Sequence, residues 1–348
     1  MNADRFRKLA DATGPFISIY FDDSHDTADA AAQLDARLRD IRKHLEDESV
    51  DASVIETIEN AVRAKHPPVG RSGRGVITAG STVVLDEHLA VPPVSTSIRV
   101  SDAPYIVPVI EHGMLHACYL LVEVDHTGAD ITLRDGSSHT EAVEGSGHPV
   151  HTANKAETAG YGGPQGRVEE AVRKNIREVA DRVTHLFDEH DLDVVFVTGE
   201  VEARAELVAA LPERVAQKVV QLQGGGRAAG IDEAEVQNEI GEEFARLRVA
   251  ALDDVVERFA AGHGRGLAID GLAEVTAALR GGAVETLIIG DLGEATAADD
   301  RGRVLPADEV LPLLAVATGA ALVRTDDRLK PADGVGAVLR YAATNSTG

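Results

Sequence analysis

Short apolar runs alternate with amphipathic helical patterns along the chain, and this alternation limits the fold more than any other feature. The run Pro15–Phe21 is rich in β-forming residues and bounded by turn-forming ones, which is typical of a buried strand. Leu34, Leu38, Ile41 and Leu45 then follow at helical spacing, which predicts an amphipathic helix. The first part of the chain is therefore expected to form an α/β block that ends near residue 100.

The last part of the chain repeats the alternation. The pattern predicts a helix at Leu272–Leu279, a strand at Val284–Ile289, a helix at Leu311–Thr318 and a strand at Ala320–Thr325. These elements imply an αβα sandwich. A charged helical segment, Ile231–Phe259, precedes them.

The middle of the chain opens with a predicted hairpin. Two β-like runs, Tyr119–Asp125 and Ala129–Arg134, flank a short turn. A polar tract without predicted structure, Gly136–Gly166, comes next, and helical spacing resumes over Val168–Leu186. The pattern ends with a strand at Val194–Thr198, a helix at Val201–Leu211 and a strand at Val215–Leu222.

A chain of 348 residues is too long for one ordinary core, and two or three domains are expected. The flexible run Gly224–Gly226 marks one joint. We predict an N-terminal α/β domain at 1–102, a middle domain at 103–223 and a C-terminal domain at 224–348.

Charge and composition exclude several classes of function. Acidic residues outnumber Lys plus Arg by 58 to 34, so a net charge of −24 argues against DNA binding and against broad nucleic-acid binding. Aromatic residues make up only 3 % of the chain, and we predict no cofactor. The single cysteine, Cys118, excludes an internal disulfide and a thiolate zinc site, and we predict no metal site. No signal peptide or membrane span is visible, so we expect a cytoplasmic protein without a membrane partner.

The strongest candidate site is a glycine-rich segment, Tyr161–Arg167, with the sequence Tyr161-Gly162-Gly163-Pro164-Gln165-Gly166-Arg167. Its glycines permit close approach of another chain, Pro164 stiffens the segment, and Gln165 offers both a donor and an acceptor. The segment leads into a predicted helix N-terminus, where free N–H groups favour phosphate.

Basic residues follow on the same helix. Arg167, Lys174 and Arg177 fall on one helical side, and residues 145–177 carry five Lys or Arg against three Glu. A local excess of +2 in an acidic chain suits contact with an RNA backbone. A disordered glycine loop before an ordinary solvated helix face would give the same pattern, and spacing alone leaves both open.

The layout of these elements resembles archaeo-eukaryotic peptide release factors and Pelota. The hairpin, the long loop with Gly-Gly-x-Gln and the basic helix are similar to their middle domain, and Gly271–Gly290 resembles their L7Ae-like third domain. The match is nearest to bacterial members, including Balon-type ribosome hibernation factors. The resemblance implies a three-domain α/β architecture, rRNA contacts at the loop and helix, binding to the A site of idle ribosomes, and assistance by elongation factor Tu.

The sequence departs from that family at one residue. Release factors carry Gly-Gly-Gln without interruption, whereas Pro164 separates Gly163 from Gln165 here. The insertion displaces the glutamine by up to about 3.5 Å and removes a backbone N–H. We therefore favour a ribosome-binding hibernation or stress factor without catalysis. The alternative is a ribosome-rescue hydrolase that cleaves peptidyl-tRNA through Gln165, and an adaptor that binds only proteins is a third possibility.

Two other groups of residues are weaker candidates, because ordinary structural roles also explain them. The acidic segment Asp22–Asp26 has ligands for a hard cation, but it also fits a turn that caps the next helix. His126, His148 and His151 lack the spacing of metal ligands and are expected to be solvated.

Overall fold

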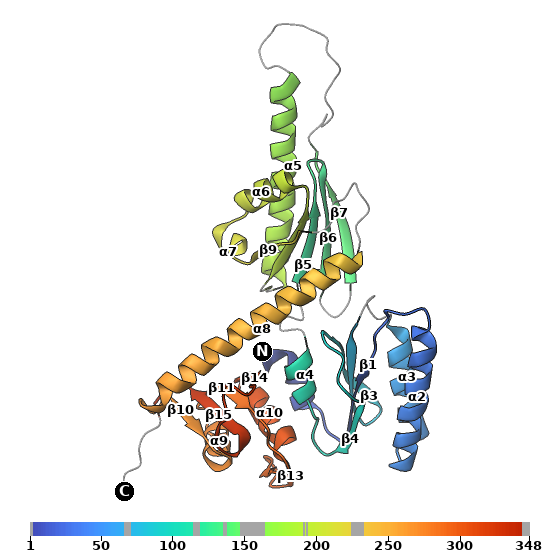
Figure 1. Ribbon diagram of the computed structural model, residues 1–348, viewed down its shortest axis with the longest axis vertical. Helices are drawn as coiled ribbons and strands as arrows, with labels where there is room; N and C mark the ends of the chain where they lie inside the picture. The colour runs from blue at the N-terminus through green and yellow to red at the C-terminus, as the bar shows by residue number, and fades with distance from the viewer. Residues whose placement is uncertain are drawn as a thin grey trace. The chain divides into compact units, whose positions relative to one another are not determined.

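The computed structural model describes residues 3–65, 71–113, 119–134, 138–146, 164–190, 192, 194–223 and 233–342. The chain forms two compact units. Unit 1 combines residues 1–115 with residues 246–348, and unit 2 consists of residues 116–245. Both are mixed α/β units built on sheets (Figure 1).

The N-terminal part of unit 1 is a four-stranded antiparallel sheet in the order β3-β2-β1-β4. Its strands are β1 (Phe16–Asp22), β2 (Gly73–Ala79), β3 (Thr82–Leu89) and β4 (Ser97–Ser101). Helices α2 (Ala30–Asp47) and α3 (Ala52–Ala64) cover one face (Figure 1). Their buried side chains pack on Ile17, Ile19 and Phe21 of β1. Three short helices flank these strands in the sequence: η1 (Ala3–Phe6) and α1 (Arg7–Asp11) precede β1, and α4 (Val107–His112) follows β4.

The C-terminal part of unit 1 is a second sheet in the order β10-β15-β11-β14. Its strands are β10 (Ala268–Asp270), β11 (Val284–Ile289), β14 (Ala321–Arg324) and β15 (Val335–Leu339). The C-terminal part also contains a separate hairpin of β12 (Thr296–Ala298) and β13 (Val304–Pro306) and the short η2 (Ala332–Gly334). Helices α9 (Leu272–Arg280) and α10 (Ala307–Ala317) pack on one face. Val255 and Phe259 of α8 (Glu233–His263) pack on the other, which confirms the predicted αβα sandwich.

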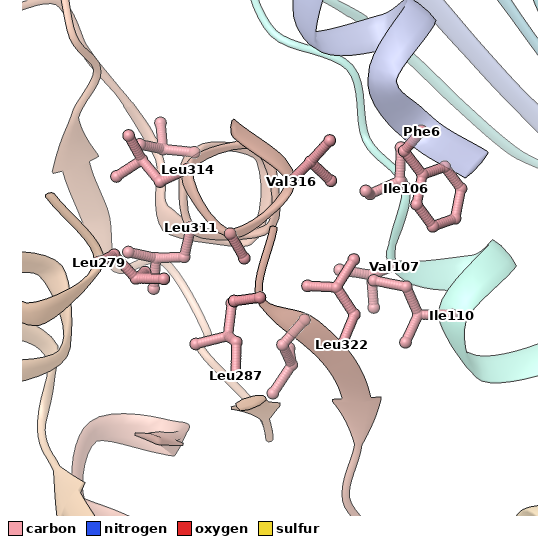
Figure 2. Packing of buried hydrophobic residues seen from close by; sticks show 14 of the residues in the cluster. Phe6, Ile106, Val107, Ile110, Leu279, Leu287, Leu311, Leu314, Val316 and Leu322 are labelled. Carbon is pink, nitrogen blue, oxygen red and sulfur yellow. The ribbon is translucent and has the colours of Figure 1, made fainter. Parts of the chain in front are cut away.

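One apolar core joins the two parts of unit 1. Phe6, Ile106, Val107 and Ile110 share a buried cluster with residues of β11, α10 and β14. Figure 2 shows Val316 and Leu322 of the C-terminal part facing this group. The first and third blocks of the sequence are therefore packed together, while the middle block is an insertion between them. The predicted boundaries at 102/103 and 223/224 stay a prediction.

A buried arginine organises the N-terminal sheet. Arg74 is fully buried and makes a bidentate contact with Asp86, with Nε–Oδ1 at 2.8 Å and Nη2–Oδ2 at 3.0 Å. Its remaining N–H groups donate to carbonyl oxygens at the C-terminal end of α3, including that of Val62 at 2.9 Å. A guanidinium there complements the negative end of the helix dipole. Arg74 Nη1 also lies 3.5 Å from buried Asp23.

Unit 2 is a five-stranded sheet in the order β7-β6-β5-β8-β9. Its strands are β5 (Tyr119–Val124), β6 (Gly128–Arg134), β7 (Ser138–Glu144), β8 (Val195–Gly199) and β9 (Val219–Gln221). Helices α5 (Pro164–Glu189), α6 (Val201–Ala210) and α7 (Glu213–Ala216) supply the core of one face. On the other face, Phe244 of α8 makes edge contacts with Tyr119 and Phe196.

Two sequence predictions for unit 2 were wrong in part. The segment predicted as one strand, Val215–Leu222, holds the end of α7 and then the three-residue strand β9. Pro212 stands before α7 with extended backbone, and Glu213 opens the helix. The polar tract Gly136–Gly166 contains the edge strand β7. Its side chains are mostly exposed, so no apolar run marks it in the sequence. The predicted hairpin is confirmed by the antiparallel pairing of β5 and β6.

The first prediction concerns Arg74. Replacing it by methionine leaves Asp23 fully buried without the guanidinium and leaves half-buried Asp86 with Lys65 alone, so Arg74→Met is expected to lower the free energy of unfolding by about 3–5 kcal/mol. Arg63→Met is the matched control, because Arg63 pairs with Asp35 at the exposed surface of α2 and α3. It is expected to cost no more than about 1 kcal/mol. Urea denaturation followed by circular dichroism measures both. Equal losses would contradict the assigned role of Arg74.

Candidate nucleic-acid interface

The N-terminal half of α5 is held to the β5–β6 hairpin by a buried asparagine. Asn175 is fully buried, and its Nδ2 donates to the carbonyl oxygen of His126 in the hairpin turn at 3.1 Å. Gly145 N–H donates to the carbonyl of Thr127 in the same turn at 2.9 Å. A Cβ at Gly145 would lie 2.1 Å from the Asn175 side chain, so only glycine permits this packing. Helix, turn and the end of β7 therefore meet at one point.

A carboxylate completes this junction. Ser146 donates its backbone N–H to Glu178 Oε2 at 2.8 Å and its hydroxyl to Oε1 of the same group. These hydrogen bonds lower the pKa of Glu178, which keeps its carboxylate ionised. We call Gly145, Ser146, Asn175 and Glu178 the helix anchor. Further along α5, Arg182 makes a bidentate contact with Glu141 of β7, which lowers the pKa of Glu141.

The helix continues N-terminally from the anchor. α5 begins at Pro164, so residues 164–174 add about 16 Å of helix before Asn175 at 1.5 Å per residue. Figure 1 shows this part of α5 extending past the end of the sheet in unit 2. We call Pro164–Arg177 the α5 tip. It is a short rod whose base is fixed by the anchor.

The helix starts four residues earlier than predicted. Proline is favoured at the first helical position, because its missing N–H would have no helical partner there and its φ angle suits the helix. The sequence predicts a loop at Pro164, whereas the structure places Pro164, Gln165, Gly166 and Arg167 in the first turns of α5. Of the other predicted site residues, Tyr161, Gly162 and Gly163 lie outside the described residues.

Three cations of the tip face solvent. Arg173, Lys174 and Arg177 are exposed, and spacings of three and four residues place them on one side of α5. Within the described part of the chain, none of the three takes part in an ion pair. The apolar residues of the same helix, including Ile176, Val179 and Val183, are buried in the unit 2 core, as predicted. The cations are therefore available to an anionic partner without disturbing the core.

Other sequence candidates have structural roles or lie outside the described residues. His126 pairs with Glu200 at 3.1 Å beside the anchor. Asp23 is buried against Arg74, and burial raises its pKa despite that neighbour. The segment Asp22–Asp26 does not cap α2, which begins at Ala30 without a side-chain cap. Cys118, His148, His151 and Gly224–Gly226 lie outside the described residues. No helix of the described part is both long and apolar enough for a membrane crossing.

Comparison with known proteins identifies the family. Two uncharacterized proteins of Mycobacterium tuberculosis, from strains CDC 1551 and H37Rv, are each 47 % identical over 370 residues, covering 100 % of this chain and 99 % of each relative. The family model for bacterial archaeo-eukaryotic release factor family 2 matches residues 118–265. The chain belongs to the bacterial archaeo-eukaryotic release factors. The matched region contains the anchor, the tip and the sheet of unit 2.

Solved structures of related type are similar over most of the chain. Archaeoglobus fulgidus Pelota has 17 % identity and a TM-score of 0.37, with 80 % of each chain covered. The archaeal translation termination factor aRF1 has 18 % identity and a TM-score of 0.25, covering 97 % of this chain and 96 % of that one. Saccharomyces cerevisiae Dom34 has 14 % identity and a TM-score of 0.39, covering 78 % and 80 %.

The patterns in the sequence did not predict the helix anchor of this release-factor-like unit. A signal was present for one member, because Asn175 lies three residues after Val172 and four before Val179, on the apolar side of the helix. A polar residue in such a stripe needs a buried partner. The partner, a carbonyl in a distant hairpin turn, has no sequence pattern. Gly145 and Ser146 carry no signal of their own, because glycine and serine are typical of an ordinary turn.

The second prediction tests the anchor by a double-mutant cycle. Gly145→Ala places a methyl group into the Asn175 side chain and is expected to destabilise unit 2 by about 1–3 kcal/mol. In the Asn175→Gly background, which also removes the Asn175 Cβ at 2.4 Å, the obstacle is gone, so the same change is expected to cost much less, with a coupling of at least about 1 kcal/mol. Hydrogen exchange of amides in β6 and α5 reports the stability of this unit. Additive effects would show that the two residues do not depend on each other.

Proposed function

We propose that the protein is a ribosome-binding hibernation or stress factor that occupies the A site of idle ribosomes. Membership of a release-factor family supports a role in translation. The observation that carries the proposal is the exposed basic face on the α5 tip. In this proposal the tip is directed at rRNA of the A site and the peptidyl-transferase centre. The proposed contacts are Tyr161, Gly162, Gly163, Pro164, Gln165, Arg167, Lys174 and Arg177.

The charge distribution explains why the tip is suited to this task. A chain with a net charge of −24 is repelled by RNA unless cations are concentrated where contact occurs. Lys174 and Arg177 are exposed at the tip, and the helix dipole adds partial positive charge at its N-terminal end. Two carboxylates lie on the same side of the helix by the same spacing: Glu178 is bonded to Ser146 and Glu170 is exposed, so the three cations outnumber them. A rigid rod with cations on one side can therefore reach into a phosphate-lined space while the acidic body stays outside.

The third prediction tests this face. Replacing Arg167, Lys174 and Arg177 together by Ala is expected to weaken co-sedimentation with bacterial ribosomes strongly. Each lost phosphate contact is expected to reduce the slope of log affinity against log salt by about one unit. The measurement is pelleting at several salt concentrations, with circular dichroism to confirm folding.

The matched control removes the same number of charges elsewhere. Arg265, Arg301 and Lys330 are exposed residues of unit 1, and their joint replacement by Ala changes the net charge equally. That variant is expected to pellet as well as the unchanged protein. If both triple variants bind alike at every salt concentration, the tip is not the binding site.

Occupancy of the A site has its own test. Ribosomes with a vacant A site are expected to retain the protein, whereas ribosomes whose A site holds aminoacyl-tRNA are expected to release it. The resemblance to hibernation factors also implies assistance by elongation factor Tu, so pelleting with and without added factor is part of the same experiment. Equal binding to vacant and filled ribosomes would contradict A-site occupancy.

The alternative function is hydrolysis of peptidyl-tRNA by Gln165. Pro164 opens α5, so Gln165 lies in the first helical turn with its backbone set by the helix rather than by a loop. Catalysis is sensitive to displacements of about 1 Å, which can cost about 100-fold in rate. This placement after an inserted proline supports binding without hydrolysis.

The fourth prediction separates the two functions. The purified protein is expected to release no peptide from ribosomes carrying peptidyl-tRNA beyond the level without factor. Gln165→Ala is expected to leave that background unchanged, and to weaken ribosome binding only by the loss of one proposed rRNA contact. Release well above background that Gln165→Ala abolishes would establish the hydrolase instead.

A further inference from the structure

The outer strand of the N-terminal sheet has free backbone groups, and the hydrogen bonds of β1 show which ones. Asp23 N–H donates to the carbonyl of Ser72 at 2.9 Å, and Gly80 N–H donates to the carbonyl of Pro15 at 2.9 Å. Because backbone groups alternate sides along an antiparallel strand, the odd-numbered residues of β1 bond toward β2. The even-numbered residues bond toward β4.

The backbone N–H and C=O groups of two β4 residues therefore point away from the sheet. Ser97, Arg99 and Ser101 are the partners of the even-numbered residues of β1. Ile98 and Val100, which lie between them, direct their N–H and C=O groups away from the sheet. Among the backbone hydrogen bonds of the described residues, none engages these groups. β4 is thus an edge strand that can accept another strand.

A cleft borders this edge. It has a volume of about 530 Å³, and its lining includes Ile98–Ser101, the end of α2, the segment Gly293–Thr296 and the start of α10. The volume lies in the range of ligand sites. The side chain of Val100 is 41 % exposed, so an apolar contact is available beside the free backbone groups.

The cleft is acidic. Glu48 and Glu294 are exposed at its rim, and no ion pair involves either one in the described part of the chain. At its floor Arg99 contacts Asp308 at 2.9 Å and Glu309 at 3.3 Å, so one guanidinium faces two carboxylates. Four carboxylates outnumber Arg99 and His44, which are the other ionisable side chains of the lining, and leave an excess of negative charge.

The floor is also rigid. Arg99 lies over the ring of Tyr105 at 3.5 Å, and the Ser101 hydroxyl donates to Glu309 Oε2 at 2.6 Å. Arg99 is therefore fully engaged and offers little to an incoming anion. The cleft is pre-formed to receive positive charge.

We propose that this cleft binds an extended basic peptide segment, which adds to β4 as a further strand. The free N–H and C=O groups of Ile98 and Val100 would supply main-chain hydrogen bonds. Lysine or arginine side chains of the segment would meet Glu48 on one side of the strand and Glu294 and Asp308 on the other. A second copy of this chain is a poorer occupant, because edge pairing would bring two acidic clefts together.

The experiment uses the full chain and three labelled octapeptides in fluorescence anisotropy. The first repeats Lys-Lys-Val-Val, which places lysines on both faces of an added strand, the second repeats Glu-Glu-Val-Val, and the third is the basic peptide with all its backbone amides N-methylated. Only the first is expected to bind. Loss of pairing by N-methylation is expected to weaken binding by about tenfold or more.

Two variants locate the site. Val100→Pro removes an N–H that points outward, so the sheet keeps its own hydrogen bonds and binding is expected to fall about tenfold. Glu48→Gln together with Glu294→Gln is expected to weaken binding several-fold, while Glu257→Gln together with Glu274→Gln, which removes two charges at exposed residues outside the cleft lining, is the matched control without effect. Thermal unfolding checks that each variant folds.

Three outcomes would overturn the proposal. The N-methylated peptide binding as well as its parent would exclude strand addition. Equal binding of the acidic peptide, or no binding of the basic one, would exclude a basic partner. A dimer in analytical ultracentrifugation that Val100→Pro abolishes would assign the edge to a second copy. None of these outcomes bears on ribosome binding by the α5 tip.

Discussion

The apolar core shared by the two ends of the chain is the constraint on which the architecture depends. Phe6 and Val107 belong to the same buried cluster as Leu311 and Leu322. Neither the first nor the last block therefore completes its core alone. Burial of apolar surface is the main stabilising contribution to folding, and here it fixes two distant segments in one unit. The middle block is thereby inserted into a framework and can form an independent sheet with its own core.

Within unit 2, polar contacts fix the position of the helix against the hairpin. Apolar residues hold α5 on the sheet, but a hydrophobic stripe does not by itself specify how far the helix is shifted along it. Asn175 and Gly145 specify that position, because a buried amide must meet its carbonyl partner and only a glycine leaves room for it. The basic residues then lie at the base and along the side of the tip. Position and charge together give an acidic protein one surface that suits RNA.

Most elements could be predicted because their apolar spacing is strong. The hairpin of β5 and β6, the apolar face of α5 and the αβα arrangement at the C-terminus follow from periodicity alone. The strand β7 was missed because its side chains are mostly exposed and its pairing with β6 is carried by the backbone. The start of α5 was placed too late because Pro164 and Gly166 suggest a loop, although proline suits a first turn.

The sequence by itself determined the α/β class, the release-factor resemblance and the location of basic residues on one helix. Each depends on local order, such as residue spacing, charge and short motifs, which the chain carries before it folds. Only the tertiary structure decided that the two ends share a core, that Arg74 neutralises buried Asp23 and half-buried Asp86, and that β4 leaves an acidic, unpaired edge. These features join residues far apart in the chain, and no local pattern encodes which distant group will be the partner.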